Sequence, residues 1–350
     1  MGRLLFLICV DSDPDRPEYG GARYDCPDKL AWRALPELAK KFSTLRSEFS
    51  SKLNSSLKFT WFMRSDLQIQ KVYGDAAWCL KNFESMWKRL SDEGDELAWH
   101  PHAWYWNDSR KCWYNEISES ENILKSYDVG FMAFKDKMGF SPAATRSGIN
   151  FHNSRTLERL DELGIKADLS ANPRLKLFYA RPAVGGSMIE GYDWSRAPVD
   201  PYHPSRFDYQ LPAGGNEALS LIEIPLTTWR KDFDDLEFWR GLIPVCFFNG
   251  TATTGRPIMK GWFVADVWGD PFRFELAFNH VLRKASKAEL AHFASALHPD
   301  DITDRNYRRL RRNLSYAISA ARQNGMELEF VTASEAHQII SGAGELKIAS

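Results

Sequence analysis

The fold is decided by the stretch Leu4-Leu5-Phe6-Leu7-Ile8-Cys9-Val10, which is followed directly by Asp11-Ser12-Asp13. A continuous apolar run of this length, without alternation, is typical of a strand buried on both faces of a parallel sheet. The run is too short to cross a bilayer, and the two aspartates after it do not resemble a signal-peptide cleavage site. We therefore expect a buried first strand, no stable insertion into a membrane and a cytoplasmic protein.

The rest of the chain alternates between short apolar runs and helical patterns. This alternation predicts an α/β fold with a parallel sheet and right-handed crossovers. Pro36 lies inside the first helical pattern, where we expect it to kink or split the helix. Helices are expected at 28–50, 75–90, 117–137, 154–163, 272–284 and 302–322, and strands at 59–63, 96–100, 143–146, 166–169, 218–226, 292–298 and 328–331, with a further apolar segment at 236–248.

Periodicity is lost between about residues 170 and 215, where Pro, Gly, Tyr and Arg are dense. A stretch this long without regular structure is usually a functional loop or an insertion. The sequence contains no internal repeat and no obvious linker. We therefore expect one barrel-like domain over residues 1–350 that carries an irregular insertion at about 170–215.

Charge and cysteine content exclude several classes of protein. The net charge of -1 does not form the basic footprint of a nucleic-acid binder, and the arginines of 305–312 are expected to form a solvated helix face. The 5 cysteines are scattered, odd in number and without a CxxC pair, which favours reduced thiols in the cytoplasm over a disulfide framework. The sequence leaves open whether the chain forms an oligomer.

Asp11 and Asp13 follow the first strand directly. Residues i and i+2 of an extended chain point to the same face, so both carboxylates should project together at the carboxyl end of the sheet, where ligands of parallel α/β folds bind. Two such charges repel, and a cation or a shared proton normally accounts for the pair. The alternative is a solvated, Asp-rich loop.

His100 and His102 repeat this spacing at the end of a later strand, in the segment Leu97-Ala98-Trp99-His100-Pro101-His102. Neutral imidazole is a common ligand of divalent transition metals, and two histidines with one aspartate suit zinc with an open position. A single histidine near a strand end is most often structural, but two at this spacing, with an Asp-x-Asp on another strand, favour a metal site.

These segments resemble motifs of the polysaccharide-deacetylase superfamily, the NodB-type carbohydrate esterases. The first motif resembles Val10–Asp13 and the second Glu96–His102. The third resembles Thr145-Arg146-Ser147-Gly148, and the last Leu297-His298-Pro299-Asp300. A weaker likeness covers Gly191-Tyr192-Asp193-Trp194. The resemblance spans most of the chain and implies a distorted (β/α)7 TIM-like barrel.

The resemblance also implies a divalent metal ion, with Zn²⁺ the expected one, bound by Asp13, His100 and His102. The family spaces its two histidines four residues apart, whereas here position 104 is Trp. His102 is therefore taken as the substitute ligand, and His152 is a further candidate.

Catalytic roles follow from the same resemblance. Asp11 corresponds to the general base, and Arg146 to the arginine that pairs with the base and orients it. His298 corresponds to the catalytic acid, and Asp193 to the carboxylate that tunes this histidine. In such a site a bound metal polarises the acyl carbonyl and lowers the pKa of its water.

The sequence thus predicts a metal-dependent hydrolase that removes an N-acyl group, N-acetyl being the expected one, from an amino sugar or a surface-polysaccharide precursor. A glycosidase or small-amide hydrolase is a second hypothesis, which activity after chelation would favour. A non-catalytic sugar-binding barrel is the third. Trp194 and Tyr202 are candidate sugar platforms, although core or loop positions explain such aromatics at least as well.

Overall fold

The computed structural model describes residues 2–15, 30–51, 53, 56–107, 112–115, 120–183, 186–231, 261–286 and 288–343. The apolar segment expected at 236–248 and the helix start expected at Asp28 lie outside these residues. Within them, no helix is both long and apolar enough to span a membrane.

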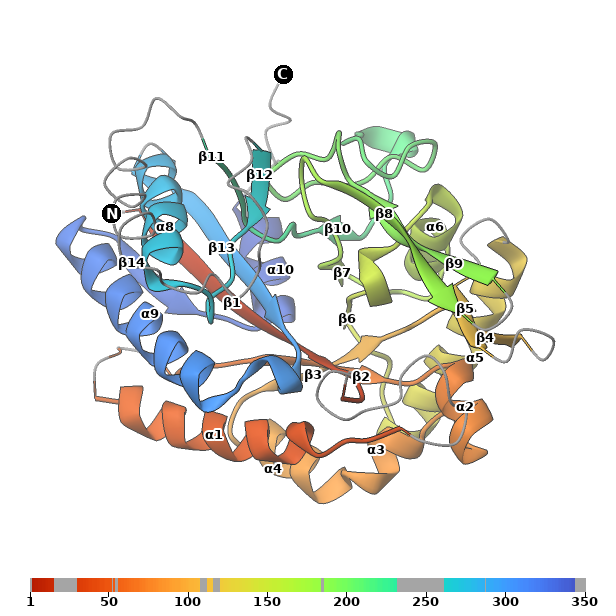
Figure 1. Ribbon diagram of the computed structural model, residues 1–350. Coiled ribbons are helices and arrows are strands. Elements are labelled where there is room, and N and C mark those ends of the chain that lie inside the picture. Colours follow the sequence, from red (N-terminus) through yellow and green to blue (C-terminus); the bar gives the residue numbers. More distant parts are fainter. Residues whose placement is uncertain are drawn as a thin grey trace.

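One curled sheet of eight strands forms the centre of the molecule, and every pairing in it is parallel (Figure 1). The order is β10-β7-β6-β3-β2-β1-β13, with β14 also paired to β1. The parallel sheet agrees with the alternation of strands and helices in the sequence, and its curled form agrees with the distorted barrel that the resemblance implies. Its strands are β1 (Arg3–Ser12), β2 (Thr60–Arg64), β3 (Glu96–His100), β6 (Ala144–Thr145), β7 (Ala167–Asp168), β10 (Ile222–Glu223), β13 (Leu290–Leu297) and β14 (Glu327–Phe330).

Hydrogen bonds outside the regular strand pairings connect the segment after β10 to β13 and so complete the curl of the sheet. After β10 the chain reaches β13, where the Thr227 amide donates to the Ala294 carbonyl over 2.8 Å and the Ala294 amide donates to Thr227 Oγ1 over 2.9 Å. Strand β1 pairs with β13 along one edge. Along its other edge, β14 pairs with residues 3–6 and β2 pairs with residues 9–12. Strand β1 is therefore held by three neighbours, which explains why its apolar run is continuous.

Side chains of β1 alternate between two apolar layers. Leu5, Leu7 and Cys9 pack inside the curled sheet, together with Phe62 of β2 and Ala98 of β3. The alternate residues pack outward against the helices, and each such fully buried side chain stabilises the fold by about 1.5–3 kcal/mol. These outward residues are Leu4, Phe6, Ile8 and Val10.

Helices cover the outside of the sheet (Figure 1). Pro36 does not kink α1, because the helix begins at Ala34 and the proline lies in its first turn, where no intrahelical amide bond is lost. The helix expected at 75–90 is divided at Phe83. The helices are α1 (Ala34–Phe49), α2 (Leu67–Tyr73), α3 (Trp78–Asn82), α4 (Glu84–Asp92), α5 (Ser120–Met138), α6 (Ser154–Glu162), α8 (Pro271–Ala285), α9 (Asp304–Gln323) and α10 (Ala333–Gly342).

Among the described residues, three antiparallel strand pairs are separate from the eight-stranded sheet. One of them, β8 (Lys176–Ala183) with β9 (Gly186–Asp193), lies in the segment expected to be irregular, so that part of the expectation is wrong. The dense Pro and Gly of this segment hid the strands from a periodicity argument. The other hairpins are β4 (Trp104–Asn107) with β5 (Cys112–Asn115) and β11 (Thr228–Lys231) with β12 (Gly261–Val264).

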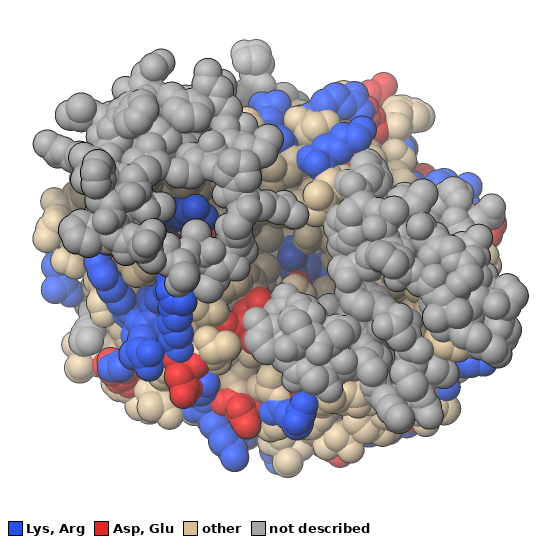
Figure 2. Space-filling view, viewed as in Figure 1, with Lys and Arg blue, Asp and Glu red and all other residues tan. Residues whose placement is uncertain are grey.

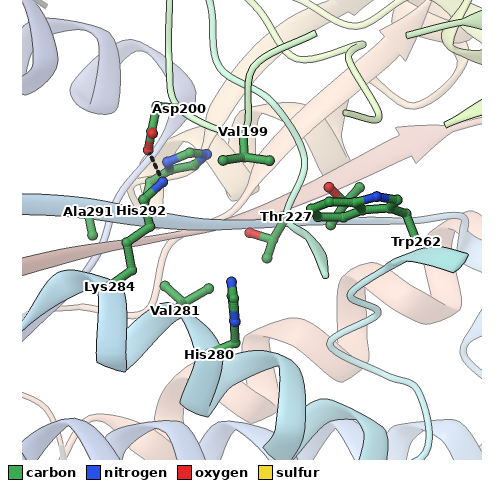
Figure 3. Close-up of a pocket in the computed structure, with 10 residues that line it drawn as sticks. Val199, Asp200, Thr227, Trp262, His280, Val281, Lys284, Ala291 and His292 are labelled. Carbon is green, nitrogen blue, oxygen red and sulfur yellow. Dashed lines mark hydrogen bonds and ion pairs between the residues drawn. The ribbon is translucent and has the colours of Figure 1, made fainter. Parts of the chain in front are cut away.

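A small cavity of about 70 Å³ lies beside the first half of β13 (Figure 3). Ala291 and His292 line it, and an ion pair between Asp200 and Lys284 borders it. His298 follows the opposite end of this strand, roughly 20 Å away at about 3.3 Å per residue. The cavity is therefore separate from the carboxyl ends of the strands, where the predicted site lies.

The arginines of 305–312 lie on α9, where basic side chains gather on the surface (Figure 2). Arg309, Arg311 and Arg312 face Asp270, Glu48 and Glu275 in turn. These neighbours agree with the expected solvated helix face.

Candidate functional site

Five strands of the barrel place a polar side chain at their carboxyl ends. On each strand an apolar residue of the inner layer comes two positions earlier, so the polar side chain points to the same interior. In Figure 2 a hollow with acidic and basic side chains opens near the middle of the visible face. The five pairs are Cys9 and Asp11, Phe62 and Arg64, Ala98 and His100, Ala144 and Arg146, and Ala296 and His298.

Asp11 and Arg146 form a buried ion pair, as the sequence predicts. Arg146 Nε lies 2.9 Å from both carboxylate oxygens of Asp11. Nη1 of the same guanidinium donates to the Leu169 carbonyl over 2.6 Å. Burial lowers the pKa of Arg146, but the charge and hydrogen bond of Asp11, together with Cys9 and Asp168 nearby, raise it by more. The arginine is therefore a fixed cation that holds one aspartate in place.

Asp13, His100 and His102 come together as a buried group of candidate metal ligands. One ligand atom from each lies within 4.8 Å of the others. His102 Nε2 is 3.4 Å from Asp13 Oδ1 and 3.1 Å from His100 Nε2. Burial and the nearby charge of Arg64 lower the pKa of His102 well below its ordinary value, so this ring is neutral.

Gly148 makes room for His102. A Cβ atom at Gly148 would lie 2.2 Å from the imidazole ring, closer than any real contact. The Gly148 amide also donates to the Pro101 carbonyl over 2.8 Å. A residue without a side chain at position 148, the last of the third motif, therefore leaves room for a histidine ring two residues after His100.

His298 lies beside both aspartates of the first strand. Its Nε2 is 3.4 Å from Asp13 Oδ2 and 3.8 Å from Asp11 Oδ2. Its Nδ1 is 3.4 Å from Asp301 Oδ2, an oxygen that also accepts from the His298 backbone amide. Burial lowers the pKa of His298, but its hydrogen bonds to Asp13 and Asp301, with the charges of Asp301 and Asp11, raise it by more. The resulting pKa is about 9. At neutral pH this imidazole is a cation.

Asp193 does not occupy the place that the sequence suggested. Its carboxylate lies 2.6 Å from Lys176 Nζ and accepts from Ser195 Oγ over 2.6 Å, at the base of the β8–β9 hairpin. Among the described residues, Asp301 is the carboxylate at Nδ1 of His298. The expected pairing of Asp193 with His298 is therefore wrong, and the carboxylate beside this histidine is that of Asp301.

Three further candidates also lie elsewhere. His152 contacts Asp168, Ser170 and Thr156, away from the group of metal ligands. Trp194 is fully buried and donates to the Asn150 carbonyl, and Tyr202 is 4% exposed and donates to the Tyr209 carbonyl. Neither aromatic ring offers a face to a sugar, because both are core residues.

Solved structures share this arrangement of strands over nearly the whole chain. A candidate polysaccharide deacetylase from Mycobacterium smegmatis aligns with a TM-score of 0.51 and 12% identity, covering 98% of this chain and 91% of its own. A candidate glycoside hydrolase/deacetylase from Parabacteroides distasonis aligns with a TM-score of 0.58 and 13% identity, covering 98% and 72%.

The chain has the polysaccharide-deacetylase fold. No family model matches it, and neither does any of the curated proteins compared with it. At identities this low the likeness establishes the deacetylase fold alone, so the activity has to be argued from the side chains.

Arg64 is the residue of this centre that the sequence argument missed. Its guanidinium is fully buried and donates from Nη1 to Asp13 Oδ1 over 2.5 Å. The other donors reach Asp66 Oδ2 over 2.6 Å and Gln68 Oε1 over 2.8 Å. The signal was present, since an arginine that ends an apolar strand next to Asp66 is out of place unless it is paired.

The metal implied by the deacetylase fold meets the right kinds of donor here. A carboxylate and two imidazoles suit zinc. Two neighbours already engage those donors, however, because Arg64 donates to Asp13 and the Trp104 indole donates to His102 Nδ1. The donor set therefore fits a divalent cation by chemistry, while a cation and a hydrogen-bond donor of the chain itself compete for it.

Proposed function

We propose that this chain hydrolyses the amide bond of an N-acylated sugar, with N-acetyl as the expected acyl group and an amino sugar or surface-polysaccharide precursor as the expected carbohydrate. One observation carries the proposal: the carboxylate of Asp11, fixed by Arg146, lies beside a histidine that is protonated at neutral pH. A base and an acid on either side of one site are what amide hydrolysis needs.

Asp11 is the proposed general base. Arg146 fixes its orientation, because the N–H of Nε lies 2.9 Å from both carboxylate oxygens and is shared between them. Asp11 would take a proton from water as the water oxygen bonds to the acyl carbon. A pre-oriented base contributes typically 10²–10⁴-fold to such a step.

His298 is the proposed general acid. An amine leaves poorly without a proton, and the raised pKa of His298 supplies a protonated imidazole for that purpose. Its Nε2 is the atom nearest to Asp11 and so the one that would donate to the leaving nitrogen as the carbon–nitrogen bond breaks. The products are the free amino sugar and the carboxylic acid.

Asp13, His100 and His102 are the proposed metal ligands. Zn²⁺ bound there would supply a Lewis acid for the acyl carbonyl. His100 is already oriented for this role, because its Nδ1 lies 2.5 Å from the Arg146 carbonyl and leaves Nε2 directed to Asp13.

A polar cleft of about 400 Å³ lies between α1 and the segment from Pro299 to Asp304, and Arg33, Glu37 and Lys41 line it. Its lining offers groups of both charges, but the proposed base, acid and metal ligands are not part of that lining.

The test is a screen of N-acetylated amino sugars for released acetate, with and without added Zn²⁺. We expect release by the native chain and none by Asp11→Asn, which should keep its circular dichroism spectrum. Acetate release that persists in Asp11→Asn would remove Asp11 as the base. A native chain that binds these sugars without cleaving them would favour the non-catalytic barrel.

A further inference from the structure

The structure points to Arg64 as an internal competitor for the divalent cation. We propose that a metal ion enters the site only by displacing Arg64 from Asp13 and the Trp104 indole from His102. The inference deepens the proposed function, because it concerns how the same ligands take up a cation.

The first observation is where the guanidinium lies. Arg64 Nη1 is 2.5 Å from Asp13 Oδ1, and this same oxygen is the one nearest to His100 and His102. A divalent ion bound between the three ligands would use the oxygen that Arg64 already contacts. Two cations at one carboxylate oxygen repel each other, so occupation by one weakens the other.

The second observation is that Arg64 is held firmly. Its Nε donates to Asp66 and its Nη2 to Gln68, and all three side chains are fully buried. Burial lowers the pKa of Arg64, but the charges of Asp66 and Asp13 raise it by more, so the group remains a cation. A buried cation that loses one carboxylate partner is strongly destabilised. Displacement of Arg64 is therefore costly.

The third observation concerns the protons on the two imidazoles. His100 Nδ1 lies 2.5 Å from the Arg146 carbonyl, which can only accept, so this nitrogen carries a proton. Trp104 Nε1 can only donate, so His102 Nδ1 accepts and the proton of this ring is on Nε2.

His102 Nε2 therefore donates to His100 Nε2 across their 3.1 Å separation. The result is one continuous chain of hydrogen bonds, from the Trp104 indole through both rings to the Arg146 carbonyl. A metal bound to His102 Nε2 requires that nitrogen without a proton, and the proton would have to move to Nδ1, where the indole now donates. His100 is prepared for a metal, whereas His102 is not.

These contacts predict weak zinc binding by the native chain and tighter binding once a competitor is removed. Zinc affinity is measured by calorimetry on the full chain with Zn²⁺ alone, and thermal shift on adding Zn²⁺ gives a second readout. We expect Arg64→Met to bind zinc at least tenfold more tightly than the native chain, which corresponds to about 1.4 kcal/mol. Trp104→Phe keeps an aromatic ring over His102 without the N–H, and it should tighten binding by a smaller factor.

Two control variants separate this effect from general loosening of the structure. Arg64→Lys keeps a cation beside Asp13, and its zinc affinity should stay near the native value. Arg46→Met removes another largely buried arginine, whose Nη2 lies 2.5 Å from Asp95 at the opposite end of β3, and it should leave zinc affinity unchanged. Equal or weaker zinc binding by both Arg64→Met and Trp104→Phe would overturn the proposal.

A measurement on the native chain remains decisive should Arg64→Met fail to fold. Long-range proton–nitrogen NMR correlations distinguish the two tautomers of histidine. We expect the Nε2–H form for His102 and the Nδ1–H form for His100 in metal-free protein, with His102 changing form when zinc is added. An Nδ1–H form of His102 before zinc is added would refute the inference. Acetate release plays no part in these readouts, so the inference and the proposed function can fail separately.

Discussion

Two pairs of buried acids lie on opposite faces of the same sheet, and they are treated differently. Asp11 and Asp13 point into the barrel, and each contacts a guanidinium, that of Arg146 or that of Arg64. Asp168 and Glu223 are neighbours across β7 and β10 and point outward, because the residues on either side of each belong to the inner layer.

The outward pair is stabilised by a proton instead of by arginine. Burial and the charge of Asp168 raise the pKa of Glu223 well above its ordinary value, which favours the protonated, neutral acid. Burial also raises the pKa of Asp168, but the contact with His152 and the hydrogen bonds from Glu223 and Ser170 together lower it by more. The inner face thus provides each acid with a guanidinium, which does not lose its charge, whereas the outer face places its two acids against each other and a histidine.

The largest effect should come from removing the charge of Asp11. Asp11→Asn takes away the proposed base and should lower kcat for acetate release by about 10³–10⁴-fold. Steady-state kinetics on the best substrate of the screen gives the value. A loss of less than tenfold would mean that Asp11 is held by Arg146 for structural reasons alone.

Replacing Arg146 should break the inner pair from the other side. Arg146→Met leaves the Asp11 carboxylate buried without its cation, so we expect a loss of about 3–5 kcal/mol in the free energy of unfolding and a fall in kcat of about 10³-fold. Urea unfolding and kinetics at saturating substrate measure the two effects. If Arg146→Met unfolded at the same urea concentration as the native chain, the ion pair would not be what stabilises this region.

His298→Gln should have an intermediate effect, because the base and its arginine remain. We expect kcat to fall by about 10²-fold at pH 7. The pKa of about 9 means that native His298 is protonated below this pH, so native activity should decline as the pH rises through about 9. The pH–rate profile of the variant should lack this decline, and a profile that keeps it would assign the titration to another group.

The smallest effect on the reaction should come from the outward pair. Glu223→Gln replaces a neutral acid with a neutral amide, so kcat should change by no more than about twofold. Because the folded-state pKa of Glu223 is raised, native stability declines as the pH rises above about 4.5. The variant should lack this decline and become the more stable protein at pH 7. A large loss of activity would show that Asp168 and Glu223 take part in the reaction.

The strands of the inner sheet were predictable because each is an apolar run with a clear end, and Leu4–Val10 is the plainest case. Asp11 and His100, at two of those ends, were found for the same reason, whereas His298 was assigned through the resemblance to the last deacetylase motif. Asp301 was not found as the partner of His298, because several acids lie near that histidine in the sequence and only the conformation of the Pro299–Asp301 turn selects one.

Arg64 and the β8–β9 hairpin were missed on different grounds. A lone arginine after a strand has no spacing pattern, and its significance depends on Asp13, which lies 51 residues away in the sequence. Apolar and polar residues do not alternate along β8 and β9, and each strand is set by its antiparallel partner. Both depend on contacts between distant segments, which local patterns do not record.

The alternation of inner and outer side chains along β1, β2, β3 and β13 limits how such a centre can diversify. A single residue inserted between Cys9 and Asp11 would turn the carboxylate toward the helices and a neighbour toward the interior. Insertions within these strands would therefore destroy the site. Substitutions at the strand ends and length changes in the following loops would keep its side chains directed to the interior. An engineer seeking a new substrate should keep the register of these strands and vary the loops beyond them.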